Sequence, residues 1–183
     1  MLLISFSNTL ARLESLAARC MVVLVLLLIV VNIVTRYTGI PIYWIDELAI
    51  YAMIWMVFIT LPSLVAKRKN ISVNIIVDLF GPRPEKLLCF LSDFIICMTS
   101  GLMLNFSISW FDPISLIKVD MDINNFSIST FNYIYHEPTN TLAFNKFIVW
   151  SVIPVSFLLC VLHGFINMII SLVDIFKEKG GES

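Results

Sequence analysis

Charged residues are scarce in this chain of 183 residues, where Asp, Glu, Lys and Arg together make up 14%. Soluble domains carry about 25%. The two signs almost cancel, to a formal net charge of −1, so the sequence lacks the clustered basic charge of a protein that binds nucleic acid. This shortage of charge argues against a soluble protein.

Cysteine and histidine are scarce as well, with four and two residues. Cys20, Cys89, Cys97 and Cys160 lie in or beside apolar runs, and no two of them form a Cys-x-x-Cys pair. A disulfide framework or a zinc site is therefore not expected. The thiols are predicted to be small, buried apolar groups.

Catalytic motifs are missing too. The chain contains no Gly-x-Ser-x-Gly, no His-Glu-x-x-His and no phosphate-binding loop. Its carboxylates do not pair on one helix face as acid–base catalysis requires. The sequence therefore predicts that the chain is not an enzyme and binds neither a cofactor nor a metal.

Apolar residues, in contrast, are abundant, at 59% of the sequence. They gather in four long runs, at about residues 17–35, 44–66, 87–110 and 147–170. About twenty apolar residues are needed to cross ~30 Å of hydrocarbon, and the first run is longer than the core of a signal peptide, about 7–15 residues. We predict an all-α integral membrane protein, a single membrane domain over residues 1–183 with four transmembrane helices.

The segments outside these runs carry further predictions. Residues 70–80 are apolar but too few to span, which favours a short helix lying in the interface between spans two and three, with a re-entrant piece as the alternative. Residues 1–16 hold few charges and are expected along the interface. The connection 111–145 is long for a small bundle, and such loops are often functional or disordered.

Basic residues near the ends of the spans set the orientation of a membrane protein. One side of the predicted membrane carries Arg12, Arg19, Lys67, Arg68, Lys69, Arg83, Lys86, Lys177 and Lys179. The other side carries Arg36, Lys118 and Lys146. This bias places both termini and the loop 67–86 in the cytoplasm, and the loop 111–145 on the periplasmic side.

Polar residues inside the spans are candidates for function. Asp93, in the third span, is either part of an ion or proton pathway or a carboxylate held by Lys86 or by a donor on another helix. His163 and Asn167 share one face of the fourth span. A histidine there could titrate or bind a metal or haem. The other histidine, His136, lies in the outer loop, which favours a hydrogen bond between helices instead.

The second span carries a bulky stripe at helical spacing, formed by Glu47, Tyr51, Trp55, Phe58 and Pro62. Aromatic residues are enriched where proteins contact one another. The four predicted helices show no convincing pore, so a function as a channel on their own is not indicated. We therefore predict that this face docks against another membrane protein, with lipid as the alternative.

The segment that closes the first span and opens the second resembles a known family. The residues concerned are Arg36-Tyr37, Trp44, Asp46-Glu47 and Trp55, followed by the run from Lys67 to Asn74 and by Pro82. Their order is similar to that in the DctQ-type small permease subunit of tripartite ATP-independent periplasmic (TRAP) transporters. Asn70 and Asn74 stand where that family usually has His and Asp, and the outer loop is longer than expected for it.

The resemblance implies an accessory scaffold subunit in the inner membrane of a bacterium. Its partners would be a large multi-span permease subunit, which holds the substrate and sodium sites and takes up organic acids, and a periplasmic substrate-binding protein. Together with the bulky stripe, the resemblance predicts a partner interface at Arg36, Trp44, Asp46, Glu47, Tyr51, Trp55 and Phe58.

Two other functions are compatible with a small membrane protein. A redox subunit would need paired intramembrane histidines or pairs of outer cysteines, and the sequence has neither. A self-contained homodimeric transporter would use Asp93 as its coupling group, and it would transport without any partner until Asp93→Asn abolished the activity.

Overall fold

Four long helices dominate the computed structural model, which describes residues 2–67 and 82–181. They are α1 (Leu2–Tyr37), α2 (Tyr43–Ala66), α4 (Pro82–Phe111) and α8 (Val152–Gly181). Each belongs to a stretch long and apolar enough to cross a membrane, so the predicted all-α fold with four transmembrane helices is confirmed. The interfacial helix predicted at residues 70–80 lies outside the described residues.

The first helix begins earlier than predicted. It runs unbroken over 36 residues, a length of about 54 Å at ~1.5 Å per residue. The expectation that residues 1–16 lie along the interface is therefore wrong, because the helix that spans the membrane starts at Leu2. A stripe of buried residues explains the extension and consists of Ser7, Ala11, Glu14, Ala18 and Val25. Their spacing of three, four and seven places them on one face of the helix, toward the rest of the bundle.

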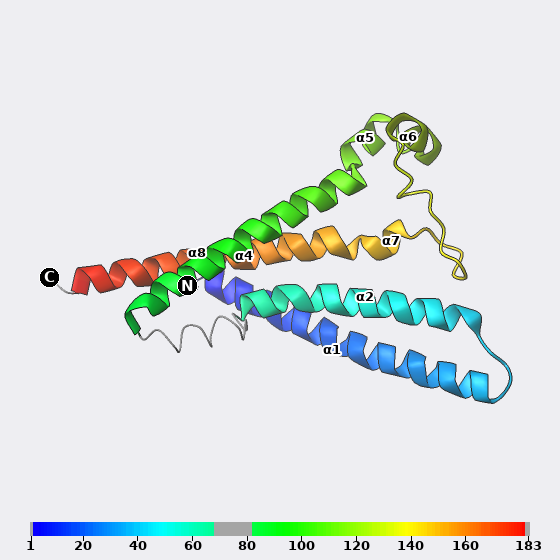
Figure 1. Ribbon diagram of the computed structural model, residues 1–183, viewed down its shortest axis with the longest axis horizontal. Coiled ribbons are helices and arrows are strands. Elements are labelled where there is room, and N and C mark those ends of the chain that lie inside the picture. The colour runs from blue at the N-terminus through cyan, green and yellow to red at the C-terminus, as the bar shows by residue number, and fades with distance from the viewer. Residues whose placement is uncertain (1, 68–81, 182–183) are drawn as a thin grey trace.

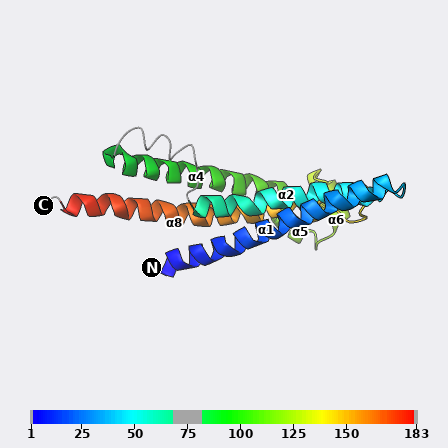
Figure 2. The same ribbon diagram turned by 90° about the horizontal axis from the view of Figure 1, so that it is seen from below.

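The long helices pack in the order α1, α2, α8, α4, with α4 crossing α8 obliquely (Figures 1 and 2). α8 contacts both α2 and α4, whereas α1 packs chiefly on α2. Only 11% of the most apolar stretch of the α1 span, and the same share of the α4 span, is buried within the chain, against 39% in the span that contains α8. The two edge helices therefore leave most of their apolar surface to lipid or to another protein.

A tight turn at residues 38–42 makes α1 and α2 antiparallel neighbours. Gly39 has a φ of 76°, a conformation that glycine adopts without steric cost. The N–H of Ile40 donates to the carbonyl oxygen of Thr35 at 3.0 Å, which satisfies the end of α1. Pro41 follows at the point where the helix cannot continue.

The contact between α4 and α8 is close because Gly164 has no side chain. A Cβ atom at that position would lie 3.3 Å from the Cα atom of Cys97 on α4. The cysteines are all free thiols. Cys160 is buried as predicted, whereas Cys20 is exposed on α1 and the other two are half-buried.

The long outer connection is folded rather than disordered, and we call residues 112–146 the cap. It contains α5 (Pro113–Lys118) and α6 (Ile123–Thr130), and it leads through α7 (Phe147–Trp150) into α8. Each of the two cap helices starts at an aspartate. The side chains of Asp112 and Asp122 accept backbone N–H groups of the first turn, as N-cap residues do.

The cap has a small apolar core of its own, formed by Phe126, Ile134 and Tyr135. The hydroxyl of Tyr135 donates to the carbonyl oxygen of Phe111 at 2.7 Å, which ties the cap to the end of α4. Burial raises the pKa of Tyr135, and the nearby charge of Asp112 raises it further. The cap therefore keeps its shape through packing and helix capping, not through its covalent connection alone.

Candidate functional site

The outer ends of α1 and α2 are joined by a charged cluster. Arg36 forms an ion pair with Asp46, and the side-chain amide of Asn32 donates to the other oxygen of the same carboxylate. Arg36 Nε also donates to Asn32 Oδ1 at 3.2 Å. Asp46 lies in the first turn of α2, where the helix dipole favours negative charge. Two residues of the predicted partner interface, Arg36 and Asp46, are thus brought together and fasten the hairpin.

Glu47 is buried and holds the cap on α2. Its Oε1 accepts the Tyr51 hydroxyl at 2.6 Å and the N–H of Asn140 at 2.8 Å. Its Oε2 accepts the N–H and the hydroxyl of Thr141 at 2.6 and 2.5 Å. Glu47 was expected at a partner interface, yet the donors that surround it come from its own chain. The donors of the cap are more than ninety positions away in the sequence, so sequence reasoning had no signal for this contact.

The rest of the bulky stripe also faces inward. Trp55 Nε1 donates to the carbonyl oxygen of Val149 on α7 at 2.9 Å. Phe58 packs edge-on against Phe157 of α8, with ring centroids 6.1 Å apart. Trp44 differs, because it is 44% exposed at the start of α2. Of the predicted interface residues, the accessible ones are therefore those near the α1–α2 turn.

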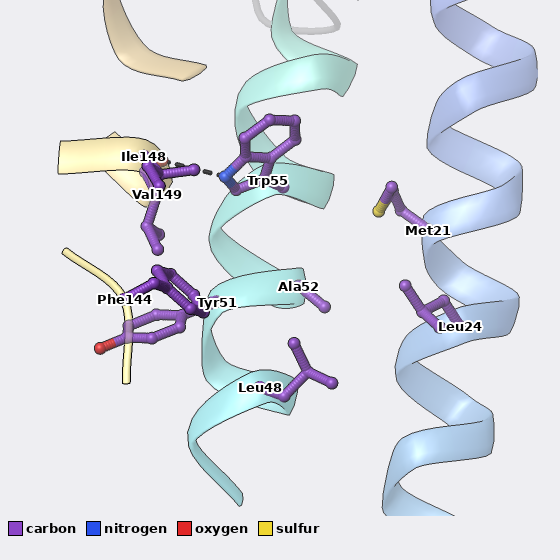
Figure 3. A pocket seen from close by; sticks show the side chains of 9 residues that line it. All are labelled: Met21, Leu24, Leu48, Tyr51, Ala52, Trp55, Phe144, Ile148 and Val149. Carbon is purple, nitrogen blue, oxygen red and sulfur yellow. Dashed lines mark hydrogen bonds between the residues drawn. The ribbon is translucent and has the colours of Figure 1, made fainter. Parts of the chain in front are cut away.

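An apolar groove of about 210 Å³ lies beside this stripe, between α1, α2, α7 and the end of the cap (Figure 3). It is lined by Met21, Leu24, Leu48, Tyr51, Ala52, Trp55, Phe144, Ile148 and Val149. The O–H of Tyr51 and the N–H of Trp55 already donate within the chain. The groove suits an apolar guest, such as an acyl chain or an aliphatic side chain, rather than a polar solute.

His163 is fully buried between α8 and α1. Its Nδ1 lies 2.7 Å from the hydroxyl of Ser7, and its Nε2 lies 3.1 Å from Glu14 Oε1. The order Ser–His–Glu is that of a hydrolase triad, but Ser7 is only 4% exposed and cannot meet a substrate. The network instead joins two helices, the role expected for His163 from the sequence. Sequence reasoning missed Ser7 and Glu14, although their spacing of seven on one face was visible.

Asp93 and Asn167 lie in two further contacts between helices. Ser171 on α8 donates its hydroxyl to Asp93 Oδ2 on α4 at 2.6 Å. Asn167 donates its side-chain amide to the carbonyl oxygen of Val65 on α2 at 2.8 Å. Asp93, His163 and Asn167 therefore take part in contacts between three different pairs of helices.

These observations define a class of protein. Each neighbouring pair of helices in the order α1, α2, α8, α4 is joined by a polar contact. The edge helices α1 and α4 leave most of their apolar surface unburied within the chain. No group of His, Cys, Asp and Glu that could hold a metal ion occurs among residues 2–67 and 82–181. The chain is an integral membrane protein whose polar side chains join its helices and whose edge helices bury little of their apolar surface within the chain.

The comparison with protein families names the family. The model of the DctQ component of tripartite ATP-independent periplasmic transporters matches residues 25–174, so the chain belongs to that family and is a small TRAP transporter subunit. The family is a transporter component rather than a family of enzymes. Searches of curated proteins and of solved structures gave no match.

Proposed function

We propose that this chain is the fixed accessory subunit of a sodium-driven transporter that takes up organic acids across the bacterial inner membrane. It packs against the large multi-span permease subunit, which binds substrate and sodium and carries out the transport movement. A periplasmic binding protein delivers the substrate. Both termini and the loop 67–86 lie in the cytoplasm, and the cap lies in the periplasm.

The observation that carries this proposal is the set of polar contacts along the helix order. The Arg36–Asp46 pair joins α1 to α2, the Asn167 amide joins α8 to α2, and the Ser171 hydroxyl joins α8 to α4. The Ser171 contact is buried, the Asn167 contact is partly buried and the Arg36–Asp46 pair is exposed. Each contact fixes one register between two neighbouring helices and so opposes sliding of one helix past the other. A transporter that moves one part through the membrane needs another part that stays in place. A bundle held together in this way would widen the stationary part.

The proposed partner surface consists of residues that the chain itself does not bury. Arg36, Trp44 and Asp46 are accessible near the α1–α2 turn, and α1 and α4 expose most of their apolar surface. Glu47 and Trp55 support this surface from inside, because each bonds to another part of the chain. We place the large subunit against an edge helix, with Trp44 at the outer rim of the interface.

The test is co-purification in mild detergent of a tagged copy expressed with its chromosomal neighbours. We expect a large multi-span protein in stoichiometric amount. Trp44→Ala should reduce its recovery, and Tyr133→Ala, an exposed aromatic residue of the cap, serves as the matched control. A homodimer or a lone chain that transports by itself, and stops on Asp93→Asn, would replace this proposal with a self-contained transporter.

A further inference from the structure

The cap exposes large apolar side chains although it has a core of its own. Ile114, Ile117, Met121 and Phe131 are between 63% and 82% exposed. Met121 and Phe131 also have positive φ angles, 61° and 55°. Glycine or asparagine adopts this backbone conformation more readily. The core of the cap does not bury these side chains, which leaves an apolar surface that could be covered from outside the chain.

The short helix α5 shows in which direction this surface points. Ile114 and Ile117 are three residues apart and share one face of the helix. Leu116 lies on another face and packs against the core of the cap. Lys118, the last residue of α5, is also exposed beside the two isoleucines. The exposed part of α5 thus combines an apolar pair with one basic side chain.

The position of α5 at the end of a predicted membrane span indicates what surrounds it. In Figure 1, α5 and α6 lie to the side of the bundle, and the α1–α2 turn reaches further along the bundle axis than they do. α5 follows directly after the last turn of α4, where Trp110 is 44% exposed and its ring lies 6.1 Å from that of Trp150. Tryptophan gathers at the boundary between hydrocarbon and headgroups, which favours a position of α5 near that boundary.

We propose that the exposed face of α5 lies on the outer leaflet of the bilayer and anchors the cap to it. Ile114 and Ile117 enter the boundary between headgroups and acyl chains, and Lys118 extends its ammonium to a lipid phosphate. A lipid surface is the occupant because the apolar surface of α5 continues that of α4, a membrane-spanning helix. The anchor fixes the cap at a set depth beside the bundle. It does not depend on the scaffold function, but the choice of the outer leaflet rests on the orientation proposed above.

The experiment places one additional tryptophan at Ile117 or at Ile114 in the full chain, reconstituted alone in phosphatidylcholine vesicles. Lipids brominated near the top of the acyl chain quench tryptophan that touches them. The emission of the unmodified chain is subtracted, because it has four tryptophans. His136→Trp, at an exposed position elsewhere in the cap, is the matched control, and circular dichroism verifies the helix content of each variant.

We expect the added tryptophan of Ile117→Trp and Ile114→Trp to emit at shorter wavelength and to lose most of its emission to brominated lipid, while that of His136→Trp keeps its emission. An added tryptophan at both α5 positions that emits as in water and is not quenched would overturn the proposal and leave this face to a protein partner. Equal quenching at all three positions would overturn it too, because the contact would then not be specific to α5. Neither result bears on co-purification with the large subunit.

Discussion

The buried network around His163 allows a quantitative prediction. His163→Leu removes the partner of Ser7 and the partner of Glu14 Oε1, while Oε2 of the same carboxylate is buried and already lacks a hydrogen bond from the described residues. Leaving a buried polar group without its hydrogen-bond partner costs about 1–3 kcal/mol. His163→Leu does this to two groups, the Ser7 hydroxyl and the Glu14 carboxyl group. We expect a loss of about 2 kcal/mol or more in the free energy of unfolding.

A compensating variant separates the network from simple packing. Glu14→Leu and Ser7→Ala, added to His163→Leu, remove every polar group that the single change leaves unsatisfied. Replacing all partners of a buried hydrogen-bonded set with apolar residues can be nearly neutral or stabilising, so the triple variant should lie within about 1–2 kcal/mol of the unmodified chain. The assay is reversible denaturation in mixed micelles, followed by circular dichroism.

Two results would refute this reasoning. If His163→Leu alone leaves the free energy of unfolding unchanged, the network does not hold α1 to α8. If the triple variant is less stable than His163→Leu, the polar groups stabilise the bundle individually. Their interaction with one another would then not be the main contribution to the free energy of unfolding.

Three further predictions concern other contacts. Gly164→Val should force α8 away from α4 and lower the thermal stability in detergent. Gly101→Ala is the control, because an added Cβ there meets nothing within 4 Å, and it should leave the thermal stability unchanged. Equal melting temperatures of the two variants would contradict the close approach of α4 and α8. Glu47→Gln should speed hydrogen exchange at the N–H of Thr141, because one carboxylate oxygen becomes a donor, and unchanged exchange would mean that the cap is held elsewhere. Asn125→Cys should react with an impermeant maleimide from the periplasmic side, and reaction only after the inner face is opened would reverse the orientation.

The number and type of the long helices could be predicted from the sequence, because a run of some twenty apolar residues has few other interpretations. The start of α1 could not be predicted in the same way. Its first part is held by Ser7 and Glu14, which lower the hydropathy of the segment while they bond to another helix. A search for apolar runs alone therefore misses a helix end that is packed through polar residues.

The contacts of the candidate site could also be predicted only in part from the sequence. Arg36 and Asp46 were predicted as residues of a partner interface and not as a pair with each other, although the two residues flank one short turn. The inward direction of Glu47 and Trp55 was not visible, because their partners are in the cap and in α7, about a hundred residues away along the chain. A bulky stripe on an isolated helix has the same appearance whether it faces a partner protein or another part of its own chain.

The packing of both α2 and α4 on α8 has a consequence for the order of assembly. α8 is the last long helix of the chain, so a polypeptide made from its N-terminus completes the α1–α2 hairpin and α4 before their common neighbour exists. Asp93 meets Ser171, and Val65 meets Asn167, only after the final span has entered the bilayer. A chain that ends before α8 would keep the α1–α2 hairpin but lose the contacts that hold α4 in the bundle. The hairpin and α4 would then lie in the bilayer without their common packing partner, and such a chain is a substrate for quality control in the cell.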